Sequence, residues 1–125
     1  EKSWDYIIKT IAKNHYSKYK HPKETLLRLE EIGVYCKANN INLVLLIVPH
    51  YKEFHNRLVK FDLVDEEENF KNDIKNIGRV IDFDFPNSIT NCKSCFSDPI
   101  HTTDSISEII VDEIFSDSLI IGKEL

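Results

Sequence analysis

Hydrophobic and polar positions along the chain follow a helical period in some segments and form short apolar runs in others. After His21-Pro22, small or apolar residues recur every three or four positions at Leu26, Leu29, Gly33 and Cys36. This spacing predicts a helix with one buried face. Pro22 suits the first turn of that helix, and Asn39-Asn40 suits its C-terminal end.

Two other segments have the length and the apolar character of strands. Residues 41–48 form an aliphatic run that Pro49 ends, and residues 80–85 follow Gly78. A run without polar alternation is typical of a strand that is buried on both faces of a parallel sheet. Helical spacing also predicts helices near residues 4–11, 53–61, 64–77 and 106–114, the last opened by a capping box of Ser105 and Glu108.

The resulting order is helix, strand, helix, strand, loop, helix, which predicts an α/β fold with a parallel sheet flanked by helices. A chain of 125 residues that is 42% hydrophobic suits one domain, residues 1–125. Two strands make a thin sheet, the chain starts at Glu1, and it contains no methionine. We therefore expect a processed product, or the C-terminal part of a larger domain.

Composition excludes several classes of partner. The formal net charge is −5 and the lysines are scattered, so we expect no nucleic-acid surface, which needs an excess of basic residues. No apolar run approaches the length of a membrane span.

The three cysteines are an odd number and do not indicate a disulfide framework. The sequence leaves the compartment and the oligomeric state open, and it indicates no cofactor.

Candidate chemistry gathers where the two predicted strands end. In an open α/β sheet, ligands bind outside the carboxyl ends of the strands. His50 follows the first strand, and a long loop after the second reaches Asp98 and His101. An aspartate at this spacing can fix one ring nitrogen of the histidine and leave the other to accept a proton. We therefore predict Asp98 and His101 as an acid–base pair and His50 as a substrate-binding residue on the same rim.

The segment Phe96-Ser97-Asp98-Pro99-Ile100-His101, followed by a predicted helix at 105–115, resembles the last block of SGNH/GDSL-type hydrolases. In that family an Asp-x-x-His precedes the final helix. The resemblance extends over roughly residues 22–116 and is greatest to the second half of envelope-associated SGNH-like proteins, which are often linked to acyl groups on surface polysaccharides. It implies a partial three-layer, flavodoxin-like parallel sheet.

The resemblance also implies roles. His101 would be the general base and Asp98 its orienting carboxylate in an esterase or acyltransferase that acts on an acyl ester or a glycan, with a bacterial cell envelope as the expected location. The family's serine nucleophile follows a Gly-Asp-Ser-like turn. None of the three glycines here precedes a serine in such a turn. We therefore expect the nucleophile upstream of Glu1, and this chain alone to be inactive.

The sequence also leaves a zinc site and a non-catalytic role open as alternatives to a hydrolase. Cys92-x-x-Cys95 with His101 has the ligand types of a zinc site, with His50 or His55 as a fourth ligand, although two thiols without a special role suit the spacing better. Asp82 and Asp84 alternate with apolar residues, which predicts polar side chains that face outward at a strand end. The chain could also be a non-catalytic binding or interaction module.

Overall fold

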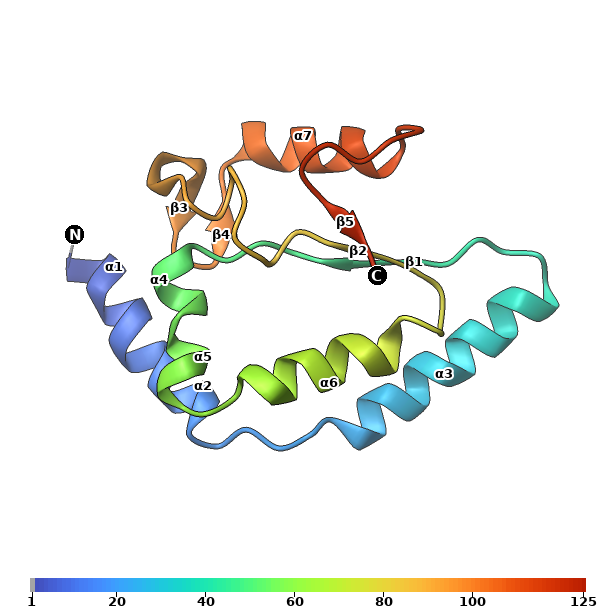
Figure 1. The fold of residues 1–125 in the computed structure, drawn as a ribbon, viewed down its shortest axis with the longest axis horizontal. Helices are drawn as coiled ribbons and strands as arrows, with labels where there is room; N and C mark the ends of the chain where they lie inside the picture. Colours follow the sequence, from blue (N-terminus) through green and yellow to red (C-terminus); the bar gives the residue numbers. More distant parts are fainter. Residues whose placement is uncertain (1) are drawn as a thin grey trace.

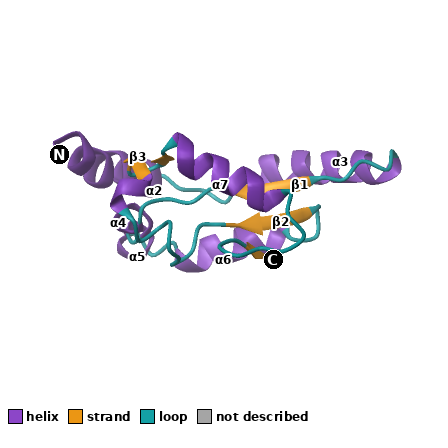
Figure 2. Ribbon diagram, turned by 90° about the horizontal axis from the view of Figure 1, so that it is seen from above, coloured by secondary structure: helices purple, strands orange, loops and turns teal. Residues whose placement is uncertain are grey.

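A small mixed sheet forms the centre of the protein. The computed structural model describes residues 2–125. The sheet contains β1 (Val44–Ile47), β2 (Arg79–Asp82) and β5 (Lys123–Glu124) in the order β1-β2-β5. β1 and β2 are parallel, with Ile47 opposite Asp82, and they run side by side in Figure 2. β5 pairs with β2 antiparallel. The predicted α/β character is confirmed, and the sheet is mixed rather than wholly parallel.

Two long helices cover one face of the sheet (Figure 1). They are α3 (Lys23–Ala38) and α6 (Val64–Ile74). Leu26, Ile74 and Val80 form the buried core between these helices and the strands. Gly33 lies on the predicted buried face of α3. It allows close packing there, because a Cβ at this position would lie 2.7 Å from the backbone oxygen of Ile77.

The other face of the sheet is covered by α7 (Asp104–Ile114), which contributes Ile110 to a core with Ile81 and Phe83 (Figure 1). This helix begins earlier than predicted, because Thr103 occupies its N-cap position. The expected Ser105/Glu108 capping box is therefore wrong.

The two parallel strands differ in burial. In β2, Val80, Ile81 and Asp82 are all buried, as expected for a central strand. β1 lies at the sheet edge, and Val44 and Leu46 are exposed. The prediction that the first strand is buried on both faces is wrong, because the apolar residues of α7 pack on β2 and the loop that follows it.

The remaining elements gather at the carboxyl ends of β1 and β2. The N-terminal helix comprises α1 (Lys2–Tyr6), a π-helical turn η1 (Ile7–Ile11) and α2 (Ala12–Tyr16). The short elements are α4 (Lys52–His55), α5 (Arg57–Lys60), η2 (Lys93–Cys95), β3 (Phe96–Asp98) and β4 (His101–Thr102), the last two forming a separate antiparallel pair. Both groups lie at the same end of the sheet (Figure 1).

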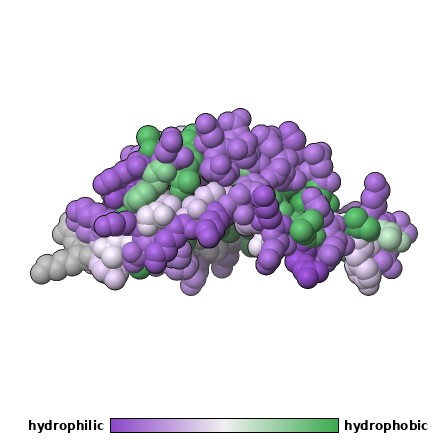
Figure 3. All heavy atoms as spheres, turned by 90° about the horizontal axis from the view of Figure 1, so that it is seen from below, coloured by the Kyte–Doolittle hydropathy of each residue, from purple (hydrophilic) through white to green (hydrophobic). Residues whose placement is uncertain are grey.

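The surface on the α3 and α6 side is largely hydrophilic, with separate apolar groups (Figure 3). Among residues 2–125, no helix combines the length and the apolar composition that crossing a bilayer requires. This agrees with the prediction of no membrane span in this chain.

Candidate functional site

The predicted pair of Asp98 and His101 is built by one tight turn between β3 and β4. Asp98 Oδ1 accepts hydrogen bonds from the backbone N–H groups of Ile100, at 2.8 Å, and His101, at 3.0 Å. An aspartate that accepts from the backbone two and three residues ahead stabilises a turn by itself. Pro99 occupies the turn and is fully buried, which holds the loop in place. Local sequence therefore fixes the position of both residues.

The side chains of this pair are joined directly. His101 Nδ1 lies 2.7 Å from Asp98 Oδ2. Burial alone would raise the pKa of Asp98, but hydrogen bonds from the His101 ring and the Ile100 N–H lower this pKa below its ordinary value. Asp98 is therefore ionised at neutral pH and accepts the Nδ1 proton, which leaves Nε2 as the basic nitrogen. The His101 side chain is 68% exposed.

The serines nearest to this pair are occupied elsewhere. Ser97 donates its hydroxyl proton to the backbone oxygen of His101, at 3.1 Å. Ser105 and Ser107 bond to Thr103 and Thr102. Within residues 2–125, none of these three hydroxyls bonds to the His101 ring.

A second histidine–aspartate pair lies deeper, after the ends of β1 and β2. Asp84 Oδ1 accepts the backbone N–H of His50, at 2.9 Å, and Asp84 Oδ2 lies 2.8 Å from His50 Nδ1. Asp84 is nearly buried, and its backbone N–H donates to Asp82 Oδ1 at 2.7 Å. The parallel register places these loops together, since Ile47 is opposite Asp82.

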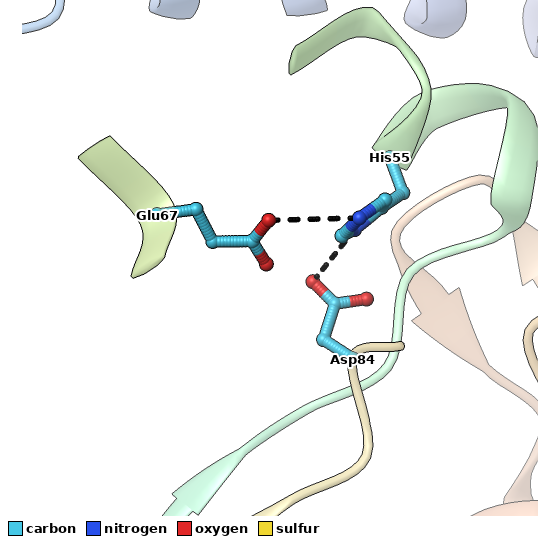
Figure 4. A group of neighbouring side chains, drawn as sticks. All are labelled: His55, Glu67 and Asp84. Atoms are coloured by element: carbon cyan, nitrogen blue, oxygen red, sulfur yellow. Dashed lines mark ion pairs between the residues drawn. The ribbon is translucent and has the colours of Figure 1, made fainter. Parts of the chain in front are cut away.

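Two more side chains extend this second pair into a cluster. The His55 ring lies between two carboxylates, with Nδ1 3.4 Å from Asp84 Oδ2 and Nε2 3.6 Å from Glu67 Oε2 (Figure 4). Lys71 Nζ lies 2.9 Å from Glu67 Oε1 and 3.0 Å from Asp82 Oδ2. Helix α6 contributes Glu67 and Lys71 one turn apart, so both face the end of the sheet.

Charges in this cluster support one another. Burial alone would raise the pKa of Asp84, but hydrogen bonds from His50 and the interaction with His55 hold that pKa far below its ordinary value. The Asp84 carboxylate raises the pKa of His55, against the opposite effect of burial. Burial would lower the pKa of Lys71, yet Glu67 and Asp82 raise it. The Asp84 carboxylate is therefore ionised, and Lys71 is charged.

A cavity of about 330 Å³ opens beside His50. Its apolar wall comes from α2, α5, α6 and the residues around them: Tyr16, Tyr19, Pro22, Ile47, Leu58, Leu63 and Phe70. Its polar groups include His50, Lys71 and Asp84. Burial, followed by the nearby charges of Asp84 and Glu67, raises the pKa of Tyr16 to about 12, so this phenol stays protonated. An apolar pocket with a few convergent polar groups is the usual form of a small-molecule site.

The two histidine–aspartate pairs share one end of the sheet but lie on different sides. The Tyr51 N–H donates to the Pro99 oxygen, at 2.9 Å, so the loops that carry His50 and His101 are neighbours. His50 contacts the cavity on the α6 side, whereas β3 and β4 lie on the α7 side (Figure 1). The structure thus brings the predicted residues to one end without joining them in a single cluster.

Several sequence-based expectations about this region are wrong. Asp82 and Asp84 do not face outward; they are 0% and 6% exposed. His55, considered above as a fourth zinc ligand beside the cysteines, belongs instead to the deep cluster. Cys92 and Cys95 form a disulfide, so they offer no thiolate pair to a metal. Sequence reasoning missed Glu67 and Lys71, and the only signal was two opposite charges four residues apart on a predicted helix.

Comparisons of this chain with protein-family models, with curated proteins and with solved structures find no match.

Proposed function

We propose that residues 1–125 supply the acid–base half of an SGNH-like serine esterase or acyltransferase. His101 is the general base, and Asp98 is the carboxylate that orients it. The observation that carries this proposal is the 2.7 Å contact between His101 Nδ1 and Asp98 Oδ2, with Asp98 held by two backbone N–H groups. Such a pair fixes the tautomer that leaves Nε2 available, which is the requirement of a Ser-His-Asp triad.

The proposed reaction is acyl transfer. A serine outside this chain loses its hydroxyl proton to His101 Nε2 as its oxygen attacks the acyl carbonyl. The imidazolium that forms is stabilised by the Asp98 carboxylate, which stays ionised. The tetrahedral intermediate then expels the alcohol, which takes the proton back from Nε2. Water or an acceptor hydroxyl then attacks the acyl-serine in the same way, giving its proton to His101 Nε2. The serine leaves with that proton and is free again.

The finer fold and the substrate class belong to this proposal. The sheet of residues 2–125 would be part of a larger, three-layer flavodoxin-like sheet, and its exposed β1 edge is compatible with an added strand. The proposed substrates are acyl esters on envelope glycans, with His50 at the substrate-binding rim. The Cys92–Cys95 disulfide is consistent with an oxidising compartment outside the cytosol.

The test uses the protein translated from the full reading frame, with hydrolysis of an acetyl ester as the readout. His101→Ala is expected to lower kcat by about 10³-fold or more, because a triad without its base retains only residual catalysis. The matched control is His15→Ala, an exposed histidine on α2 that should keep full activity. Full activity in the His101 variant, or no ester hydrolysis and no serine labelling by a fluorophosphonate, would rule out the proposal.

The alternative is a non-catalytic binding module, which the apolar cavity beside His50 favours. Under this alternative the full protein shows no ester hydrolysis, and a bound small molecule protects the cavity-lining Tyr16 and Leu58 from solvent. Chemical shift changes at these residues would distinguish binding in the cavity from binding at the exposed pair.

A further inference from the structure

The geometry points to a binding site for a divalent transition-metal ion of the Zn²⁺ type, formed by His55, Glu67 and Asp84. This site belongs to the deep cluster, and its occupancy does not depend on the proposed acyl-transfer reaction. Imidazole nitrogen and carboxylate oxygen are ligands that zinc takes in proteins. The three residues come from three separate elements, namely α4, α6 and the segment after β2.

The ligand atoms converge. Each residue offers one ligand atom, and the three atoms lie within 4.8 Å of one another. Zinc–ligand bonds of about 2.1 Å in a tetrahedron place neighbouring ligand atoms about 3.4 Å apart. His55 Nδ1 lies 3.4 Å from Asp84 Oδ2, and the other ring nitrogen, Nε2, lies 3.6 Å from Glu67 Oε2 (Figure 4). An ion binds only one nitrogen of the ring, so the ring would have to shift until that nitrogen faces both carboxylates, and the three ligand atoms would have to close from the present limit of 4.8 Å.

The two contacts of His55 have the lengths of ion pairs rather than of short hydrogen bonds. Nitrogen–oxygen hydrogen bonds in proteins usually span about 2.7–3.2 Å, and both His55 separations exceed that range. The His55 side chain is only 24% exposed. If this ring turned so that one nitrogen faced the space between the two carboxylates, the three residues would form an open coordination site.

Glu67 is held by one oxygen and presents the other, whereas Asp84 has one oxygen held and shares the other between the rings of His50 and His55. Lys71 holds Glu67 Oε1, at 2.9 Å, while Oε2 is the oxygen that faces His55. The His50 backbone N–H holds Asp84 Oδ1, at 2.9 Å, while Oδ2 faces the rings of His50 and His55. Partners of this kind orient metal ligands in known sites, and their loss usually weakens binding. His50 and Lys71 are therefore positioning residues for the site.

Charge and access also favour a cation. Lys71 pairs with Glu67 and Asp82, and Lys123 lies 3.6 Å from Asp82 Oδ2. Among residues 2–125, the Asp84 carboxylate pairs with His50 and His55, while Lys71 Nζ donates to the backbone oxygen of Asp84 at 2.9 Å. Asp84 lines both the 330 Å³ cavity, with Glu67, and a second cavity of about 130 Å³, with His55. An ion can reach the three ligands from either side.

The test is calorimetric titration of the full chain with ZnCl₂, its disulfide intact, followed by the visible absorption of Co²⁺ as a geometric probe. We expect one Zn²⁺ per chain and a Co²⁺ spectrum of low coordination number. His55→Gln and Glu67→Gln should each weaken Zn²⁺ binding by at least about 10-fold, because three protein ligands set the affinity. His50→Gln should weaken it less, through Asp84.

Two controls keep the result specific. His101→Gln changes the histidine of the exposed pair, and His15→Gln changes a solvent-exposed histidine; both should bind Zn²⁺ as the unaltered chain does. Circular dichroism confirms that each variant is folded. The proposal is overturned if no Zn²⁺ binds up to 1 mM, a ceiling of about −4 kcal/mol, if folded His55→Gln binds equally well, or if His101→Gln abolishes binding. Ester hydrolysis is measured separately, so failure here leaves the acyl-transfer proposal to its own test.

Discussion

Two histidine–aspartate pairs at one end of the sheet use the same residue types under opposite conditions. Asp98 and His101 are three residues apart, and the His101 ring is 68% exposed. Asp84 and His50 are 34 residues apart, and the Asp84 side chain is 8% exposed. Both contacts are short, at 2.7 Å and 2.8 Å. Distance alone therefore does not separate a catalytic pair from a structural or metal-binding one.

The residues around each pair distinguish the two pairs from each other. The exposed pair stands at the tip of a turn, so a substrate can approach Nε2 of His101. The deep pair is enclosed by His55, Glu67 and Lys71, so its charges are neutralised by neighbours. Such mutual compensation is what permits charged groups below the surface. The first pair is suited to proton transfer with a bound substrate, and the second to holding elements or an ion together.

The largest expected difference is in catalysis, and Asp98→Asn tests it. In the full protein this change should lower kcat for ester hydrolysis by about 10⁴-fold, because the amide no longer selects the productive tautomer of the histidine. The free energy of unfolding should fall by no more than about 1 kcal/mol. Asp112→Asn makes the same change at an exposed position of α7 and should keep full activity. A loss smaller than 10-fold would show that Asp98 does not orient the base.

The next largest difference is in stability. Asp84→Ala should reduce the free energy of unfolding by about 3–5 kcal/mol, because it leaves the backbone N–H of His50 and the charges around it without their partner. Asp98→Ala should cost about 1 kcal/mol, since water replaces its contacts. Urea denaturation of both variants measures the difference.

A double-mutant cycle makes the stability comparison sharper. His50→Ala, Asp84→Ala and the double variant give the coupling energy of the deep pair. The equivalent cycle on Asp98 and His101 should give a smaller coupling, because that pair is solvated. Equal coupling energies in the two cycles would contradict the contrast drawn from burial.

The contact between Asp98 and His101 could be predicted from the sequence because its geometry is local. A backbone turn over residues 98–101 brings the two side chains together, and this requires no knowledge of the rest of the chain. The deep pair needs the register of β1 with β2, which a single sequence does not specify. Asp82 and Asp84 were expected to face outward, since alternation normally places polar residues in water. Asp82 is buried because Lys71, on α6, supplies a compensating charge, and Asp84 is buried because His50 and His55 contact its carboxylate.

In the fold, too, the elements with a local pattern could be predicted and those that depend on distant residues could not. The periodic face of α3 and the two apolar runs predicted a helix and two strands, and the structure contains all three. β5 was missed because a strand of two polar residues, Lys123–Glu124, carries no hydrophobic pattern. The segment that leads into β5 is held by Glu113. The buried carboxylate of this residue accepts hydrogen bonds from the backbone N–H groups of residues 120–122, at 2.6–2.8 Å. A buried glutamate on a helix has no sequence signal that separates it from an exposed one.

A smaller effect is expected from the disulfide, which lies close to the exposed pair. Replacing both Cys92 and Cys95 with serine should lower the free energy of unfolding by about 2 kcal/mol, as loop-closure entropy predicts for so short a loop. The Cys95 oxygen accepts the Thr103 N–H, at 3.0 Å, so hydrogen-exchange protection should fall around residues 95–103. Protection at Ile81 should be unchanged.

Reductant provides the matched control for the disulfide. Added to the unaltered chain, it should reproduce the effect of the double serine variant, and added to that variant it should have no effect. If protection instead falls across β2 as well, the disulfide supports the whole sheet and the two regions are not independent.

The smallest expected effect is the pH dependence of the exposed pair. The folded-state pKa of Asp98 is lowered, so its contacts stabilise the protein fully above the unfolded carboxyl pKa of about 3.9, and this contribution is lost as pH falls through the folded pKa. Because the side chain is 31% exposed, solvent screening should keep the contribution below about 1 kcal/mol.

Two measurements check this pH dependence. Carboxyl carbon NMR should show Asp98 titrating below its ordinary range, and the stability difference between the unaltered chain and Asp98→Asn should shrink as pH falls below 4. A stability difference that is constant with pH would mean that the negative charge of Asp98 is not what holds the turn. The backbone N–H groups of Ile100 and His101 would then be satisfied equally well by a neutral amide oxygen, and the value of the carboxylate would lie only in its effect on His101.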